Sequence, residues 1–251
     1  MLEHLLTSEA LVGLLTLTLM EIILGIDNIV FISIVAGKLP EKDQPRARML
    51  GLTIAMFFRI GLLLGIKWLM GLQSDLFTVF GEGFSIKDLI LIAGGLFLLG
   101  KSVTEMHSKL EGFEEEDMPS KARSFFSVIV QIILIDMVFS FDSILTAVGL
   151  AEHVEVMIVA VIISMVIMII FAGKISDFIN KRPTVKMLAL SFLILIGFML
   201  VMEGIGQHIN KGYIYFAMAF SLIVEMLNQR LRKDTPAVEL REPMKESLEN
   251  D

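Results

Sequence analysis

The chain has 251 residues, of which 55% are hydrophobic, and its mean hydropathy is +0.76. Such values are typical of polytopic membrane proteins and exclude an ordinary soluble domain of this length. A net charge of −7 and the absence of cysteine exclude a basic nucleic-acid-binding surface, disulfides, thiolate metal sites and thiol redox chemistry. Because the first twenty residues carry no basic segment and no evident cleavage site, they predict a helix entry and not a signal peptide.

Seven apolar stretches are each long enough to cross a bilayer, which takes roughly 20 residues. In chain order they lie at 9–36, 47–72, 87–107, 124–149, 154–173, 185–206 and 212–229. The stretch 74–86, with three phenylalanines and two glycines, predicts an interfacial loop. A mixed-charge linker follows the third span, and a polar tail with two prolines follows the seventh.

Along the chain, predicted loops that are rich in lysine and arginine alternate with loops that contain few of them. The loop after the first span carries four of them (Lys38, Lys42, Arg46 and Arg48), whereas the loop at 151–155 carries none. Basic residues remain on the cytoplasmic side during insertion. The pattern therefore predicts a multi-pass membrane protein with its N-terminus outside and its C-terminus in the cytoplasm.

Two similar acidic motifs lie inside apolar spans. The first runs Glu21-Ile-Ile-Leu-Gly-Ile-Asp27-Asn28, and the fourth span repeats the pattern as Asp136-Met-Val-Phe-Ser-Phe-Asp142-Ser143. Carboxylates at membrane depth are costly because no water solvates them, so they indicate a functional site. The duplication indicates one shared polar centre.

The two motifs also predict an inverted repeat. They lie 115 residues and three spans apart, so their helices cross the membrane in opposite directions. The third and sixth spans resemble each other at Gly95-Leu-Phe-Leu-Leu and Gly197-Phe-Met-Leu-Val. We expect an all-α polytopic membrane protein with seven transmembrane helices, in which a three-plus-three inverted repeat is followed by one C-terminal helix. The predicted parts are repeat one (1–107), an acidic cytoplasmic linker (108–123), repeat two (124–206), the seventh helix (207–229) and a cytoplasmic tail (230–251).

Helical geometry limits how the motif residues converge. The two acids of each motif are six residues apart, which is roughly 9 Å along an ideal helix and about 120° around it. An unbroken helix would not direct both acids to one point, so we hypothesise a local unwinding near Gly25 and Ser140. Asn28 shares the face of Glu21 even in an unbroken helix.

The ligands of these motifs are all oxygens. Four carboxylates, an amide and a hydroxyl suit hard divalent cations such as Mn²⁺, Mg²⁺ and Ca²⁺. The predicted metal site consists of Glu21, Asp27, Asn28, Asp136, Asp142 and Ser143. The alternative is that the acids pair with intramembrane Arg59, Lys67 or Lys101 and only hold helices together. Four ionised acids would repel one another, so the resting protein needs either bound protons or a cation.

Other polar residues give weaker evidence of a functional site. Glu105, His107, Glu203 and Glu225 lie near span ends, where solvation at the membrane interface explains them. Gln131, five residues before Asp136, is equally compatible with lining a site and with an interhelical hydrogen bond.

The paired motifs on the first and fourth spans resemble the TerC family of integral membrane proteins, and the similarity runs from about Leu11 to Asn228. The resemblance implies an inner-membrane protein of the LysE-like transporter superfamily, whose members export manganese from the cytoplasm. It also implies that the six motif residues line the metal site, and that Lys101 matches a basic residue of the third span. Glu203 departs from the expected pattern.

Three functions follow from these observations. The first is export of a divalent metal, with Mn²⁺ as the favoured transported substrate, by alternating access in exchange for protons, without an organic cofactor. The second is a membrane scaffold, a partner of stress or secretion complexes whose acids are structural. The third, an intramembrane aspartyl protease, is disfavoured because the chain lacks a Gly-Xaa-Gly-Asp or Tyr-Asp element, so we expect no enzyme. The pattern does not separate Mn²⁺ from Mg²⁺, Ca²⁺ or Fe²⁺, and it leaves the oligomeric state open.

Overall fold

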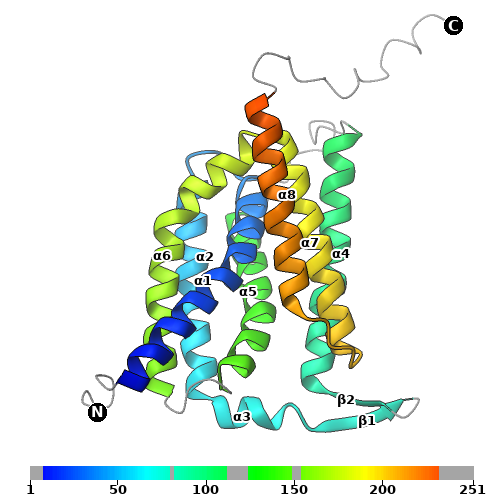
Figure 1. The fold of residues 1–251 in the computed structure, drawn as a ribbon. Helices are drawn as coiled ribbons and strands as arrows, with labels where there is room; N and C mark the ends of the chain where they lie inside the picture. The colour runs from blue at the N-terminus through cyan, green and yellow to red at the C-terminus, as the bar shows by residue number, and fades with distance from the viewer. Residues whose placement is uncertain (1–7, 80–81, 112–123, 149–153, 232–251) are drawn as a thin grey trace, which may run out of the picture.

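The computed structural model describes residues 8–79, 82–111, 124–148 and 154–231. Within these residues, seven helices of 21 to 29 residues run back and forth along one bundle (Figure 1). They are α1 (Ser8–Ala36), α2 (Gln44–Leu64), α4 (Ile86–Leu110), α5 (Phe125–Val148), α6 (Val154–Asn180), α7 (Pro183–Gly204) and α8 (Lys211–Leu231).

Five of these helices are long and apolar enough to span a membrane, namely α1, α2, α4, α6 and α7. The helix α5 contributes a shorter apolar stretch, Phe125–Phe141. Large apolar side chains such as Leu15, Phe57 and Ile170 point outward from the bundle. That distribution is expected where the surrounding solvent is lipid, because lipid tails are as apolar as a protein core. The structure thus supports several membrane spans, while the full number of seven remains a prediction.

The helices pair in a symmetric order. Helix α1 packs mainly on α6, α2 packs on α5, and α4 packs on α7. In the predicted repeat, α1 corresponds to α5, α2 to α6 and α4 to α7. Under this correspondence the α1–α6 pair matches the α5–α2 pair, and the α4–α7 pair matches itself. Figure 1 also shows that α1 and α5 run in opposite directions. This pairing is the one that an inverted repeat requires, and the repeat itself stays a prediction.

Gly95 and Gly197, which the sequence comparison of the third and sixth spans aligned, face each other where α4 crosses α7. A Cβ on Gly95 would lie 2.6 Å from the Gly197 carbonyl oxygen, and one on Gly197 would lie 2.9 Å from the Gly95 carbonyl oxygen. Only glycine allows two helix backbones to approach so closely. The two glycines therefore set the distance between α4 and α7.

The region after α2 differs from the prediction. The predicted second span, 47–72, ends at Leu64, and a separate short helix α3 (Ile66–Gly71) follows Gly65. The predicted interfacial loop forms an antiparallel hairpin of β1 (Asp75–Val79) and β2 (Glu82–Ser85), so the fold is not purely helical. Stacking of the Phe77 and Phe84 rings, with centroids 5.7 Å apart, stabilises this hairpin.

Helix ends follow local chemistry. Ser85 caps α4, because its hydroxyl accepts a hydrogen bond from the Asp88 amide and the Asp88 carboxylate accepts one from the Ser85 amide. Pro45 and Pro183 stand in the first turns of α2 and α7, where no amide hydrogen is needed. Helix α6 continues to Asn180, beyond the predicted end at 173. Most of the predicted linker, 112–123, and of the tail, 232–251, lies outside the described residues.

Candidate functional site

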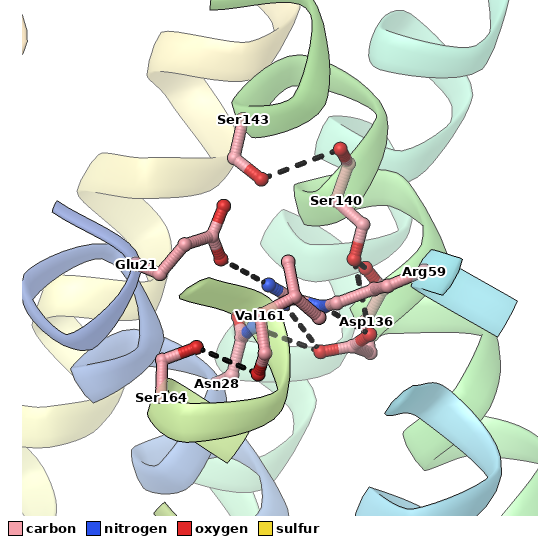
Figure 2. A network of polar contacts seen from close by, with 8 residues as sticks. All are labelled: Glu21, Asn28, Arg59, Asp136, Ser140, Ser143, Val161 and Ser164. Carbon is pink, nitrogen blue, oxygen red and sulfur yellow. Dashed lines mark hydrogen bonds and ion pairs between the residues drawn. The ribbon is translucent and has the colours of Figure 1, made fainter. Parts of the chain in front are cut away.

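A buried ion-pair cluster joins three helices in the middle of the bundle. Arg59 of α2 lies between Glu21 of α1 and Asp136 of α5 (Figure 2). Its Nη1 donates to Glu21 Oε2 at 2.5 Å, its Nη2 to Asp136 Oδ1 at 2.7 Å, and its Nε to Asp136 Oδ2 at 3.0 Å. All three side chains are at most 6% exposed. One guanidinium therefore binds both of the acids that open the two sequence motifs.

The Asp136 carboxylate accepts four hydrogen bonds. Besides the two from Arg59, Asn28 Nδ2 donates to Oδ1 at 2.9 Å and the Ser140 hydroxyl donates to Oδ2 at 3.0 Å. All four lone pairs of this buried carboxylate are engaged, and two of them accept from one guanidinium in bidentate geometry. Asp136 is thus the most fully satisfied acid of the cluster.

The spacing along α1 explains which side chains take part. Glu21 and Asn28 are seven residues apart, two helical turns, and both reach the cluster from one face, as predicted. The hypothesis of a local unwinding is wrong: α1 is continuous through Gly25 and α5 through Ser140. The single proton of the Ser140 hydroxyl is shared between Asp136 Oδ2 and the Asp136 carbonyl oxygen one turn earlier, an arrangement that is compatible with an intact helix.

Asp27 lies apart from this cluster. It is only 3% exposed, and its Oδ1 has no hydrogen-bond partner among the described residues. The six-residue spacing from Glu21 turns it to another face of the unbroken helix, as the helical geometry implied. Asn28 Oδ1 and Thr18 Oγ1, on the same helix, are likewise buried acceptors without a partner in the described part. Three buried oxygens of α1 therefore have no hydrogen-bond partner in the described part of the chain.

The remaining motif residues lie on α5. The Ser143 hydroxyl is buried and donates to the Ser140 carbonyl at 3.3 Å. The backbone of Asp142 belongs to α5, but its side chain lies outside the described part of the structure. No group of three or more acidic or histidine side chains placed to hold a metal occurs among the described residues. The structure brings Glu21, Asn28 and Asp136 together and leaves Asp27 separate.

Arg59 is the residue whose importance the sequence did not establish. The sequence analysis named it as a possible counter-ion of the acids, and the structure confirms that pairing for Glu21 and Asp136. Its signal was its position, fifteen residues into α2 and flanked by apolar residues on both sides. A lone arginine at that depth requires an anionic partner.

The carboxylate of Glu21 also borders a small cavity. Its other lining residues include Ile144, Met157 and Val161, and its volume is about 10 Å³. That volume is close to the minimum that admits one water molecule. The cavity beside Glu21 therefore has room for about one water molecule, and the Arg59 guanidinium fills the space between the two carboxylates.

Two other sequence interpretations need correction. Glu105 was expected to be solvated at the interface, but it is buried and forms an ion pair with Lys38 between the start of the α1–α2 loop and α4. Gln131 was expected to line a site or bridge two helices. Its amide instead donates to the carbonyl and hydroxyl of Ser127, on its own helix.

Glu203 lies 4.0 Å from both Lys87 and Lys211, at the end of α7. The two lysines come from the starts of α4 and α8, so the acid connects three helix ends. Its departure from the expected family pattern is therefore accounted for by a local charge cluster.

Comparisons with known proteins give the family. A model of the integral membrane protein TerC family matches residues 6–236. The "UPF0053 inner membrane protein YgdQ" of Escherichia coli is 51% identical over 228 residues, which cover 91% of this chain and 96% of YgdQ. A "UPF0053 protein" of Haemophilus influenzae is 48% identical over 234 residues, which cover 93% of this chain and 99% of the relative.

A longer relative, the "UPF0053 inner membrane protein YoaE" of Escherichia coli, is 47% identical over 233 residues. The match covers 92% of this chain and 45% of YoaE. No solved structure matches the chain.

Proposed function

The chain belongs to the TerC family of integral membrane proteins, and from this premise we propose that it exports a divalent metal ion, with Mn²⁺ as the favoured substrate, from the cytoplasm. The apolar spans and the relatives named as inner membrane proteins support a multi-pass protein of the inner membrane. The proposed substrate pathway runs between α1, α2 and α5.

The observation that carries the proposal is the cluster of Glu21, Asp136 and Arg59. Two carboxylates from the two motif helices meet around one cation inside the bundle, and they carry one more negative than positive charge. Binding sites of transporters with inverted repeats lie near the midplane, at the interface of the repeats. Glu21 belongs to the first predicted repeat and Asp136 to the second, so a cation between them would be held by both.

Arg59 then acts as the cation of the closed state. Because its guanidinium occupies the space between the carboxylates, a metal ion that binds Glu21 and Asp136 must displace it. The free acceptor Asn28 Oδ1 supplies a further oxygen ligand of the kind that Mn²⁺ accepts. Asp27 faces another side of α1 in the arrangement described, so it would join these ligands only if α1 rotates or unwinds when the metal binds. Binding of the metal would thereby favour a second arrangement of α1, α2 and α5 over the one described.

Protons are the proposed counter-ion. Carboxylate ligands must be deprotonated to bind a metal, so metal binding releases protons and proton binding releases metal. A cycle in which protons replace the metal on Asp27 and Glu21 would return the transporter without leaving bare charges in the membrane.

A structural role is the second candidate, and the same cluster favours it. Arg59 satisfies Asp136 in bidentate geometry, and an ion pair of this kind fixes helix positions without any transport. On this reading the protein is a membrane scaffold for stress or secretion complexes, and its acids only hold α1, α2 and α5 in register.

Flux measurements separate the two candidates. The purified full-length protein is reconstituted into proteoliposomes with a Mn²⁺-sensitive dye or a pH dye inside. Wild type is compared with Asp27→Asn, and with Asp75→Asn as a control, since Asp75 is an exposed acid on β1. We expect Mn²⁺ flux and an opposite proton flux in the wild type and the control, and loss of both in Asp27→Asn.

The scaffold predicts a different result. If folded wild-type protein moves no Mn²⁺ under any gradient of metal or pH, the transport proposal fails. Equal flux in wild type and Asp27→Asn would remove Asp27 from the pathway. Repeating the assay with Mg²⁺, Ca²⁺ and Fe²⁺ tests the choice of Mn²⁺ separately.

A further inference from the structure

A polar cavity lies at one end of the bundle, away from the ion-pair cluster. Its volume is about 590 Å³, and it lies where α1 and α6 end and α2 and α7 begin. Arg48, Lys181 and Lys186 line it together with Glu41, Asp177 and Asn180. Arg48 precedes Arg59 by eleven residues on α2, which is roughly 16 Å along the helix axis. The cavity is thus separate from the proposed transport site.

Arg48 is the residue that points to a ligand. It is only 8% exposed, and its one hydrogen bond within the described part of the chain runs from Nη1 to the Ser176 hydroxyl at 3.1 Å. No carboxylate among the described residues lies within 4.0 Å of it, although Asp177 acts on it through space. Its other guanidinium nitrogens are not among the buried atoms without a partner and are open to the cavity, where an anionic ligand can accept two hydrogen bonds from them in bidentate geometry.

The other lining groups define the ligand further. Lys181 and Lys186 add two positive charges, so the cations exceed the two acids of the wall by one. Asn180 Nδ2 donates to Ser176 at 3.3 Å, while its Oδ1 is buried without a partner in the described residues. A free acceptor beside the cations suits a ligand that carries a hydroxyl group next to its anionic group. A phosphate with a hydroxylated substituent has both features.

The position of the cavity favours a lipid as the source of this phosphate. The four helices that meet there are all candidate membrane spans, and the cavity lies at their ends, at the level expected for lipid headgroups. Basic pockets between membrane helices bind anionic lipid headgroups. A volume of 590 Å³ is also within the range of small-molecule sites and exceeds the needs of a bare phosphate.

We propose that this cavity binds a phosphate group, with Arg48 as its bidentate donor, Lys181 and Lys186 as its counter-charges and Asn180 as the acceptor for an adjacent hydroxyl. The headgroup of an anionic phospholipid is the source that the geometry favours, and free phosphate is the other source. The site would tie the ends of four helices to the membrane surface.

The test uses the full-length protein in nanodiscs of phosphatidylcholine with increasing fractions of phosphatidylglycerol. The thermal unfolding midpoint and the lipid retained in native mass spectrometry are compared for wild type, Arg48→Gln and Lys174→Gln. Lys174 is a matched control because it is an exposed lysine on α6 that lies over the Phe171 ring and does not line the cavity. We expect phosphatidylglycerol to bind about fivefold more weakly to Arg48→Gln, and the control to behave as wild type.

A second variant tests the site even if Arg48→Gln fails to fold. Lys181→Gln with Lys186→Gln leaves the bond between Arg48 and Ser176 intact and should weaken phosphatidylglycerol binding as well. Inorganic phosphate titrated into pure phosphatidylcholine nanodiscs identifies the source: stabilisation that depends on Arg48 assigns free phosphate, and its absence assigns the lipid. If all variants bind phosphatidylglycerol as wild type does, and phosphate has no effect, the site does not exist.

Discussion

Arg59 and Asp136 meet side on, with the Nε–Oδ2 and Nη2–Oδ1 distances at 3.0 and 2.7 Å. The two residues lie 77 positions apart and belong to α2 and α5, so this pair joins the two predicted repeats. Glu21 completes the cluster from α1. The contact therefore ties three helices of the bundle together through one guanidinium.

The ion pair should be more costly to break than to replace. Arg59→Met alone leaves the buried carboxylates of Glu21 and Asp136 without their shared cation, and losing the partner of a buried charge costs about 3–5 kcal/mol. The triple variant Glu21→Gln, Arg59→Met, Asp136→Leu removes all three charges, and we expect it to recover most of the thermal unfolding midpoint but none of the Mn²⁺ flux. A triple variant that transports Mn²⁺ at the wild-type rate would show that the cluster is not part of the pathway.

Removal of Arg59 should expose the acids to metal. In Arg59→Gln the carboxylates of Glu21 and Asp136 lose their internal cation, so Mn²⁺ should bind about tenfold more tightly or better. The measurement is the rise of the unfolding midpoint with added Mn²⁺, which is expected to be larger in the variant than in wild type. A variant that gains no stability from Mn²⁺ would contradict the displacement step.

The two buried aspartates should differ in stability. Asp136→Asn disrupts a carboxylate that accepts four hydrogen bonds and should lower the unfolding midpoint. Asp27→Asn removes a buried carboxylate whose Oδ1 has no partner among the described residues. We expect Asp27→Asn to unfold at or above the wild-type midpoint. Thermal unfolding of both variants in one detergent tests this, and a marked loss of stability in Asp27→Asn would show that the carboxylate has a structural partner.

The close approach of α4 and α7 should not tolerate a methyl group. Gly95→Ala places a Cβ 2.6 Å from the Gly197 carbonyl oxygen, and such overpacking costs about 1–3 kcal/mol. Gly100→Ala on the same helix is the matched control, because a Cβ there meets nothing within 4 Å and alanine favours helix. Unfolding midpoints should fall for the first variant and stay level or rise for the second. Equal midpoints would mean that the two helices can separate at little cost.

The orientation in the membrane can be tested without background, since the chain has no cysteine. Lys42→Cys lies between α1 and α2, and Gln207→Cys lies between α7 and α8, at the opposite end of the bundle (Figure 1). With an impermeant maleimide added to intact spheroplasts, the predicted topology gives labelling of Gln207→Cys and protection of Lys42→Cys until the membrane is opened. The reverse pattern would invert the direction assigned to transport.

The sequence alone determined that the chain lies in a membrane, that its two motif helices run in opposite directions, and that Glu21 and Asn28 share a face. These properties depend on local quantities, namely the length of apolar stretches, the cost of buried charge and the period of the helix. The tertiary structure decided which cation each buried acid receives. Arg59 contacts Asp136 only because α2 packs on α5, and Lys38 contacts Glu105 only because the segment that follows α1 reaches α4. Partner choice between distant residues depends on the packing of whole helices, and no local pattern in the chain contains that information.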